Sequence, residues 1–236
     1  MCTVTYFPLK NKIVLTSNRD EKPNRSAQKI RQEKGVFYPK EAAKNGTWFA
    51  VSESGNSIVL LNGAFENHQR KAEYRKSRGL IVLDLVVKEN IFNALQFIDL
   101  ENIEPFTLVI FQENQLAEFR WDGSEKHFKI LDINRPHIWS SATLYDEMAR
   151  EKREQIFRAF LQKEMISEET IWDFHHQKTD DLQNGITIKR QNTIQTISTT
   201  QLVISDKITL KHNDRLNPYS KTEKIFLKNE TQISAS

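Results

Sequence analysis

Runs of β-branched and aromatic residues mark two hairpins in the first quarter of the chain. Residues 2–7 and 12–18 have the composition of extended strands, and the four residues between them, Pro8 to Asn11, predict a tight turn. A second pair of strands is expected over residues 46–52 and 56–62, with its turn at residues 54–56. The polar stretch between the hairpins, residues 20–44, shows neither the spacing of a helix nor the alternation of a strand. It is therefore expected to be irregular.

The rest of the chain predicts helices and strands in separate blocks. Helical patterns cover residues 77–87, 91–98, 145–162 and 171–176. Strand patterns cover residues 106–112, 115–121, 126–133, 193–205, 207–211 and 225–228. Because these blocks do not alternate, we predict an α+β fold with antiparallel sheets and a helical layer. The chain shows no internal repeat and no low-complexity linker, so residues 1–236 are expected to form a single domain.

The helix expected over residues 145–162 has the clearest amphipathic pattern. Six apolar residues recur at helical spacing, namely Met148, Ala149, Ile156, Phe157, Phe160 and Leu161. We expect this stripe to be buried and the charged remainder of the helix to face solvent. In the next helix, His175 and His176 would point about 100° apart, which favours surface positions over joint metal ligation.

The composition of the chain mainly excludes certain classes of partner, metal site and membrane segment. Lys and Arg number 34 against 31 Asp and Glu, and a net charge of +3 is too small to indicate a nucleic-acid partner. The single cysteine excludes an intrachain disulfide and a cysteine-rich zinc site, and we expect no metal. No apolar run approaches the roughly 20 residues of a membrane-spanning helix, and the amino terminus lacks a signal peptide pattern. These features predict a cytoplasmic protein with a reduced thiol.

The single cysteine lies directly after the initiator Met, where its chemistry is unusual. Removal of Met1 would leave Cys2 with a thiol and a free α-amine on one Cα. This amine, with an ordinary pKa of about 7.7–8.0, can accept the thiol proton near neutral pH. If the turn is centred on residues 10–11, the numbers of paired residues sum to 21, so Arg19 lies opposite Cys2 and favours its thiolate. Asp20 is adjacent. Strand alternation would point it to the other face, but strand ends often deviate, and it could reach the free ammonium group instead.

Five short motifs in the first third of the chain follow the order found in one protein family. They are Met1-Cys2-Thr3, Asn18-Arg19-Asp20-Glu21, Asn45-Gly46-Thr47-Trp48, Leu60-Leu61-Asn62 and Ser77-Arg78-Gly79. Through these motifs the sequence resembles the NRDE family, also called the transport-and-Golgi-organisation family. The chain departs from the family pattern at Ser140-Ser141, where many members have Ser-Asn.

The NRDE family is similar to the cysteine-type amino-terminal nucleophile hydrolases, which include penicillin V acylases and bile-salt hydrolases. The resemblance implies a four-layer αββα sandwich and hydrolysis of a non-peptide C–N amide bond that requires no cofactor. It implies that Cys2 attacks the carbonyl carbon, that Arg19 supports the thiolate and that Asp20 orients the α-amine. Asn62 falls where these hydrolases place an oxyanion-binding asparagine, and Ser141 stands where a second substrate-orienting asparagine is expected.

The resemblance also leaves open a non-enzymatic function on the same fold. Relatives in the NRDE family have been linked to haem trafficking, so a haem-binding protein is the alternative to an amidohydrolase. The sequence has no c-type attachment motif, and an axial ligand would come from Cys2 or from any of the six His. The expected partner is therefore a small-molecule amide or haem.

Two more side chains are candidates for substrate binding. Arg78 belongs to a basic cluster with Arg70, Lys71, Arg75 and Lys76. This cluster is either a solvated loop or, at the helix start, a site for an anionic group, because free amides and the helix dipole favour negative charge there. Trp48 is expected to pack in the core, together with Phe49 and Trp139, and is the other candidate.

Overall fold

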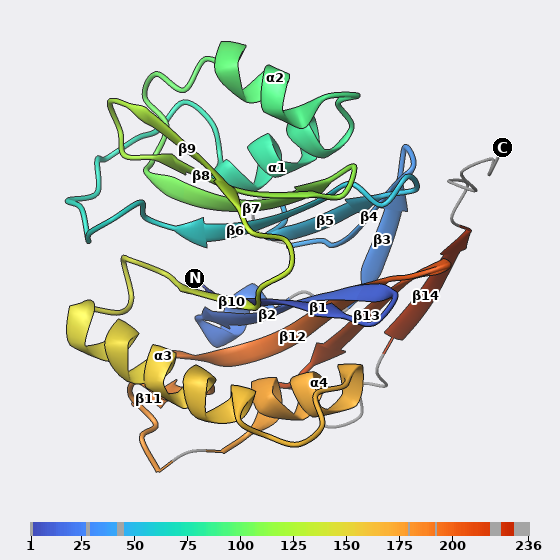
Figure 1. The fold of residues 1–236 in the computed structure, drawn as a ribbon. Helices are drawn as coiled ribbons and strands as arrows, with labels where there is room; N and C mark the ends of the chain where they lie inside the picture. The colour runs from blue at the N-terminus through green and yellow to red at the C-terminus, as the bar shows by residue number, and fades with distance from the viewer. Residues whose placement is uncertain are drawn as a thin grey trace, which may run out of the picture.

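Two antiparallel sheets stack face to face in the computed structural model, and a pair of helices covers the outer face of each sheet (Figure 1). The structure describes residues 2–26, 29–41, 45–178, 180–191, 193–217 and 223–228. The helices α1 (Arg78–Val86) and α2 (Ile91–Phe97) lie on one side, and α3 (Glu147–Leu161) and α4 (Glu168–His176) lie on the other. The layers therefore run helix, sheet, sheet, helix, as the α+β prediction and the resemblance imply.

The first sheet, sheet A, contains both the beginning and the end of the described chain. Its strands are β1 (Cys2–Leu9), β2 (Lys12–Glu21), β10 (His137–Ser140), β11 (Lys189–Arg190), β12 (Ile194–Ile204), β13 (Lys207–Asp214) and β14 (Glu223–Lys228). They are arranged in the order β10-β1-β2-β12-β13-β14, and β11 also pairs with β12. Because β12 lies beside β2, the carboxyl-terminal third of the chain completes the sheet that the first residues begin.

The second sheet, sheet B, is formed by consecutive strands in chain order. They are β3 (Ile30–Glu33), β4 (Val36–Pro39), β5 (Phe49–Ser52), β6 (Ser57–Asn62), β7 (Phe106–Gln112), β8 (Gln115–Trp121) and β9 (Lys126–Leu131). The turn between β7 and β8 has Glu113 and Asn114 at φ 47° and 59°, as a type I′ hairpin requires. A short 3₁₀ helix, η1 (Pro23–Arg25), connects β2 of sheet A toward β3.

The prediction that residues 20–44 are irregular is wrong, because this stretch contains the end of β2 and the hairpin β3–β4. Only the first of the four residues of β3 is buried, so its exposed remainder shows no alternation. The turn between the two strands has Lys34 and Gly35 at φ 52° and 73°. Strand β10 was also not predicted. It has four residues and is held by pairing with β1 at the edge of sheet A, and so short a strand leaves little sequence pattern.

Apolar side chains fill the space between the sheets and the space under each helical pair. Under α3, Phe157 and Phe160 pack against Phe7 of β1 with ring centroids 5.4 and 5.8 Å apart. The predicted apolar stripe of α3 is wrong at Met148, whose side chain is 79% exposed. Arg153, expected on the solvent face, is fully buried. Helix α3 is therefore rotated so that a charged residue faces sheet A.

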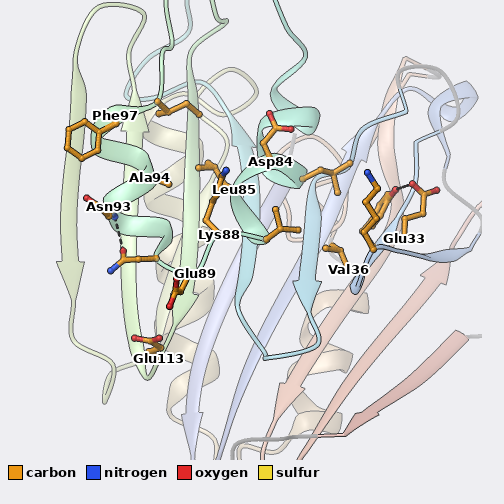
Figure 2. A pocket seen from close by; sticks show the side chains of 16 residues that line it. Glu33, Val36, Asp84, Leu85, Lys88, Glu89, Asn93, Ala94, Phe97 and Glu113 are labelled. Atoms are coloured by element: carbon orange, nitrogen blue, oxygen red, sulfur yellow. Dashed lines mark hydrogen bonds between the residues drawn. The ribbon is translucent and has the colours of Figure 1, made fainter.

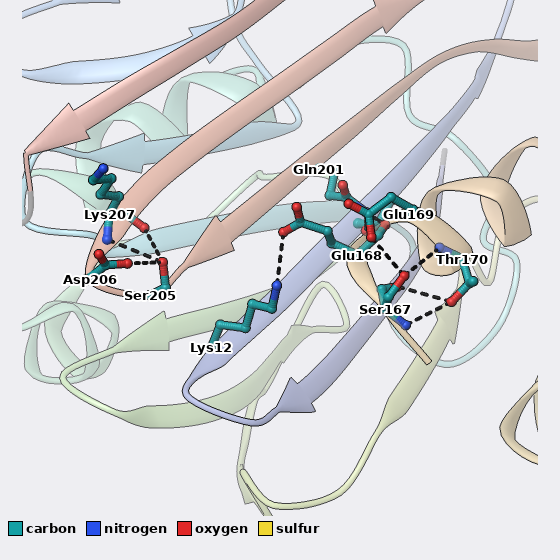
Figure 3. A network of polar contacts seen from close by, with 10 residues as sticks. Lys12, Ser167, Glu168, Glu169, Thr170, Gln201, Ser205, Asp206 and Lys207 are labelled. Atoms are coloured by element: carbon teal, nitrogen blue, oxygen red, sulfur yellow. Dashed lines mark hydrogen bonds and ion pairs between the residues drawn. The ribbon is translucent and has the colours of Figure 1, made fainter. Parts of the chain in front are cut away.

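Helix α4 is anchored to sheet A at its amino-terminal end (Figure 3). Ser167 is the N-cap and accepts a hydrogen bond from the backbone N–H of Thr170, in a capping box. Glu168 forms an ion pair with Lys12 of β2 at 3.4 Å. The Gln201 side chain of β12 donates to the Glu168 carbonyl at 3.1 Å. These contacts fix α4 across β2 and β12, so its later residues face the strands that carry the candidate site.

Candidate active site

The register of the first hairpin is the predicted one. Cys2 pairs with Arg19, and the pairing continues to Leu9 opposite Lys12. On its other side β2 pairs with β12, where Ser198 lies opposite Arg19. Position 2, Arg19 and Ser198 therefore occupy one row across three neighbouring strands. Met1 and the side chain of Cys2 lie outside the described part of the structure.

Arg19 is held in a buried network of charges and an aromatic ring. Its side chain is almost fully buried, and its guanidinium lies 4.1 Å from the centre of the Trp48 ring. It donates to the Arg25 carbonyl at 2.8 Å and pairs with Glu41 at 3.3 Å. Glu41 in turn receives two hydrogen bonds from Arg25, at 2.6 and 2.7 Å. Arg25 and Glu41 were not among the candidates, since isolated charges in a polar stretch give no distinguishing pattern.

A hollow of about 570 Å³ opens beside Arg19, and we call it the site hollow. Arg19 and Trp48 line it, together with Asn62 at the end of β6 and Arg78 at the start of α1. Four of the candidate residues thus meet in one place. Arg78 donates to the Pro105 carbonyl at 2.9 Å and pairs with Glu104 at 3.0 Å. Burial lowers the pKa of Arg78 to about 10, against the opposing effect of Glu104, so its guanidinium is still cationic at neutral pH.

Two glycines bring the start of α1 against the loop that carries Trp48. A Cβ on Gly79 would lie only 2.7 and 2.8 Å from the carbonyl oxygen and the nitrogen of Thr47. A Cβ on Gly46 would meet Gly79 backbone atoms at 3.0 and 3.1 Å. The Trp48 carbonyl then accepts a hydrogen bond from the Leu60 N–H at 2.8 Å. This close crossing places Trp48 and the helix start at the same hollow.

Asp20 lies on the other face of β2, toward the helices, as strand alternation predicts. Its carboxylate accepts hydrogen bonds from the Tyr145 hydroxyl at 2.8 Å and from the Thr196 hydroxyl at 2.6 Å. Complete burial raises the pKa of Asp20 above its ordinary value, while Arg153 and the two hydroxyl donors oppose that rise. Asp20 and Arg19 therefore occupy different environments although they are adjacent in sequence. Tyr145 and Thr196 were not candidates, since their importance depends on a contact with a distant residue.

Ser141 is buried and does not reach the site hollow among the described contacts. Its hydroxyl donates to the backbone carbonyl of Asn62 at 2.9 Å and lies 3.2 Å from the Thr143 hydroxyl. It follows β10 and thereby ties the end of β6 to sheet A. The structure thus brings Ser141 to the backbone of Asn62.

The basic cluster is mostly engaged in ion pairs. Arg70 shares Glu104 with Arg78, Arg75 pairs with Asp99, and Lys76 pairs with Asp84. Of the five basic residues, Arg75 is absent from the lining of the site hollow. The solvated-loop interpretation therefore fits Arg75 best.

The expectation that both His175 and His176 lie at the surface is wrong for His175. Its ring is fully buried, and Nε2 lies 2.8 Å from the Thr5 hydroxyl. Burial in the first place lowers the pKa of His175 well below its ordinary value, so the ring is neutral. His176 is half-buried, stacks on Trp172 and bonds to the Trp172 carbonyl at 2.8 Å.

A larger hollow, of about 1130 Å³, lies on the outer helical layer, away from these residues (Figure 2). Figure 2 shows side chains of α1 and α2 on one side of it and of the hairpin β3–β4 on the other. Its lining mixes apolar residues such as Leu85 and Phe97 with charged ones such as Glu33 and Lys88. None of the candidate residues lines it. It is therefore not part of the candidate site.

A metal ion or a haem would require ligating side chains that lie together or line a hollow. Among the described side chains, no group of three or more His, Asp and Glu is placed to hold a metal ion. No described histidine lines the site hollow or the larger hollow. Histidine-ligated haem therefore does not fit either hollow.

Comparisons with solved structures show which fold this is. The chain is similar to a mutant conjugated bile acid hydrolase from Clostridium perfringens, at 11% identity and a TM-score of 0.59, over 95% of this chain and 92% of that one. It is similar to the N-acylethanolamine-hydrolyzing acid amidase ortholog of Caenorhabditis elegans, at 11% identity and a TM-score of 0.59, over 85% and 92%. It is also similar to the penicillin V acylase of Agrobacterium tumefaciens, at 9% identity and a TM-score of 0.54, over 95% and 86%. The chain therefore has the fold of the amino-terminal nucleophile hydrolases.

Sequence comparisons identify the family. No curated protein matches the sequence. Within the described residues, none of the helices has the length and apolar character needed to cross a bilayer. The family model described as Transport and Golgi organisation 2 matches residues 1–232, nearly the whole chain. The protein therefore belongs to the Transport and Golgi organisation 2 family.

Proposed function

We propose that the protein is an amidohydrolase in which Cys2, at the amino terminus after removal of Met1, attacks the carbonyl carbon of a non-peptide amide. The observation that carries the proposal is the backbone register. It sets position 2 opposite the buried Arg19, beside a hollow that Asn62 also lines. A fold shared with proteins named as a hydrolase, an amidase and an acylase supports the same class of reaction.

In the proposed reaction the α-amine of Cys2 takes the proton of the thiol, and the thiolate sulfur bonds to the carbonyl carbon. The guanidinium of Arg19 favours the thiolate, because a nearby cation stabilises an anion. Collapse of the tetrahedral intermediate breaks the C–N bond, and the ammonium group gives its proton to the leaving amine. Water, deprotonated by the same amine, then cleaves the thioester and releases the acid with the thiol restored.

Asp20 is proposed to hold the α-amine in place. The amine is a backbone group, so it lies in the plane of the sheet and can be approached from either face. Arg19 would act from the side of the site hollow and Asp20 from the side of the helices. This arrangement accounts for adjacent residues with two different roles. It also explains why the carboxylate of Asp20 needs fixed hydrogen-bond donors, since Tyr145 and Thr196 set its orientation.

Asn62 is proposed to stabilise the negative charge that develops on the carbonyl oxygen. It lines the site hollow, and an amide N–H aimed at a developing oxyanion is typically worth about 10²–10³ in rate. Ser141 would support it indirectly, since its hydroxyl bonds to the Asn62 carbonyl. Arg78 and Trp48 line the same hollow and are proposed to contact the substrate.

The first test is the mass of the intact protein purified from cells. We expect the mass to lack Met1, because the proposed base exists only when Cys2 carries a free amine. Full retention of Met1 in natively expressed protein would sink the mechanism.

The second test compares the processed wild type with Cys2→Ser on a panel of small acyl amides, with amine release as the readout. We expect turnover by the wild type, and loss of most of it in the variant because the hydroxyl is a weaker nucleophile. Equal turnover by the two proteins contradicts a role for the thiol.

A further inference from the structure

Arg153 of α3 is the largest fully buried side chain in the described structure, and the proposed reaction does not use it. Its guanidinium is surrounded by oxygen acceptors from three distant parts of the chain. It donates to the hydroxyls of Ser140, at 2.9 Å, and Thr3, and to the carbonyls of Asn184, at 3.1 Å, and Gly185. A planar group with several fixed donors suits such a set of acceptors, whereas a lysine could not reach them all. Arg153 therefore joins β1, β10 and the segment before β11.

The positive charge of Arg153 is compensated by the ring of Tyr145 and by the carboxylate of Asp20, which Tyr145 contacts. The guanidinium lies 3.9 Å from the centre of the Tyr145 ring. The hydroxyl of Tyr145 donates to Asp20 at 2.8 Å. A buried cation is tolerated when an anion and hydrogen-bond acceptors compensate for its lost hydration. Arg153, Tyr145 and Asp20 therefore form one unit on the helical side of sheet A.

Two of the residues bound by Arg153 are partners in the same ladder. Thr3 lies opposite Ser140, and this is the first pair that β10 makes with β1. Among the described residues, Cys2, one residue earlier, pairs with β2 and not with β10. The beginning of a chain frays unless something ties it down. Arg153 binds both Thr3 and Ser140, the pair nearest the start of β1 through which β10 supports this strand.

We propose that Arg153 is a positioning residue, which acts through Thr3 to hold the first residues of β1 so that Cys2 stays in register opposite Arg19. The inference rests on the proposed function for its chemical consequence, but the contact itself makes a prediction about the strand alone. Arg153 does not touch the reacting atoms. It fixes β1 from the helical face, and Arg19 lies on the opposite face.

The test uses three variants and one matched control. Arg153→Lys keeps the charge and loses the fork of donors, Arg153→Met loses both, and Thr3→Val removes one acceptor without changing the shape of the side chain. Arg158→Met is the control, since Arg158 lies in the same helix with its side chain 76% exposed. Because Cys2 is the only cysteine, iodoacetamide alkylation reports on that thiol alone.

Two readouts are recorded on the processed protein. Hydrogen exchange measures the protection of the amides in residues 3–6, and the alkylation rate is followed between pH 5 and pH 10. In Arg153→Lys and Thr3→Val we expect exchange in this segment to be about tenfold faster, with other strands unchanged. We also expect the pH midpoint of alkylation to rise, because the thiol loses its fixed place beside Arg19. Arg158→Met should match the wild type in both.

The outcomes separate this inference from the proposed function. Wild-type exchange and alkylation profiles in folded Arg153→Lys and Thr3→Val would overturn the positioning role. A fall in melting temperature alone, with both profiles unchanged, would also overturn it. An ordinary thiol midpoint in the wild type, about 8.5, counts against the proposed hydrolase, while the exchange result still decides whether Arg153 holds the strand. If Arg153→Met does not fold, Arg153→Lys and Thr3→Val carry the test.

Discussion

Replacing His175 with Gln is expected to remove a defined part of the acid sensitivity of the protein. The ring of His175 is fully buried, and Nε2 bonds to the hydroxyl of Thr5 in β1. Burial, and then the positive surroundings of His176, Arg153 and Arg215, lower its pKa well below 6.5. The folded protein therefore keeps this ring neutral at a pH where the unfolded chain protonates it.

The size of the effect follows from the difference in bound protons. Below about pH 6.5 the unfolded state binds one more proton than the folded state, so stability is lost as the pH falls toward the folded-state pKa. For a ring that stays neutral when folded, the free energy of unfolding falls by about 1.4 kcal/mol between pH 7.5 and pH 5.5. His175→Gln cannot take up that proton, so its own loss over this interval should be smaller by up to the same amount.

The assay is urea unfolding at pH 7.5 and pH 5.5, followed by circular dichroism, for the wild type and two variants. Thr5→Val is the matched control. It removes the same hydrogen bond but leaves the titrating ring, so it should lose stability at both pH values and keep the wild-type difference between them. An identical pH difference in the wild type and His175→Gln would refute the reasoning, because it would mean that the buried ring takes up a proton without unfolding.

Three further changes test the packing and charge of the site. Gly79→Ala should lower the free energy of unfolding, measured in urea, by about 1–3 kcal/mol, because the added methyl would meet backbone atoms at 2.7 and 2.8 Å. Unchanged stability would show that α1 moves freely. Ser141→Ala should cost about 0.5–1.5 kcal/mol in the same assay by removing the donor to the Asn62 carbonyl, and a neutral result would assign that carbonyl another donor. Arg19→Met should raise the pH midpoint of iodoacetamide alkylation of Cys2. It should also lower the free energy of unfolding by up to about 3 kcal/mol, because Glu41 loses its ion pair with Arg19 and keeps the one with Arg25. An unmoved midpoint would contradict the role of Arg19.

The part of the site that could be predicted is the part with local determinants. The turn between β1 and β2 fixes which residues face each other, so Arg19 opposite Cys2 follows from counting along one hairpin. The face of Asp20 follows from strand alternation in the same way. The role of Asn62 came from the family resemblance, whereas Arg78 was a candidate because it lies in a basic cluster at a helix start. Their meeting at one hollow depends on how α1 and sheet B pack.

The part that could not be predicted depends on contacts between distant segments. In the sequence, Arg153 looks like any charged residue of an amphipathic helix, and Met148 looks like part of the apolar stripe. The burial of Arg153 is decided by acceptors from β1, β10 and residues 184–185, none of which leaves a signal near position 153. His175 was misplaced for the same reason, since its partner is Thr5, 170 residues away.

The place of β12 beside β2 sets an order in which the site can be assembled. The hairpin β1–β2 needs only the first 21 residues and can close early, because the loop between its strands is short. The Thr196 hydroxyl that holds Asp20 arrives 176 residues later, and contacts of such long range form late in folding. A growing chain on the ribosome therefore carries its cysteine and Arg19 long before it carries the groups that orient Asp20. Under the proposed mechanism, the α-amine is therefore held in its working orientation only after Thr196 has been made and β12 has paired with β2.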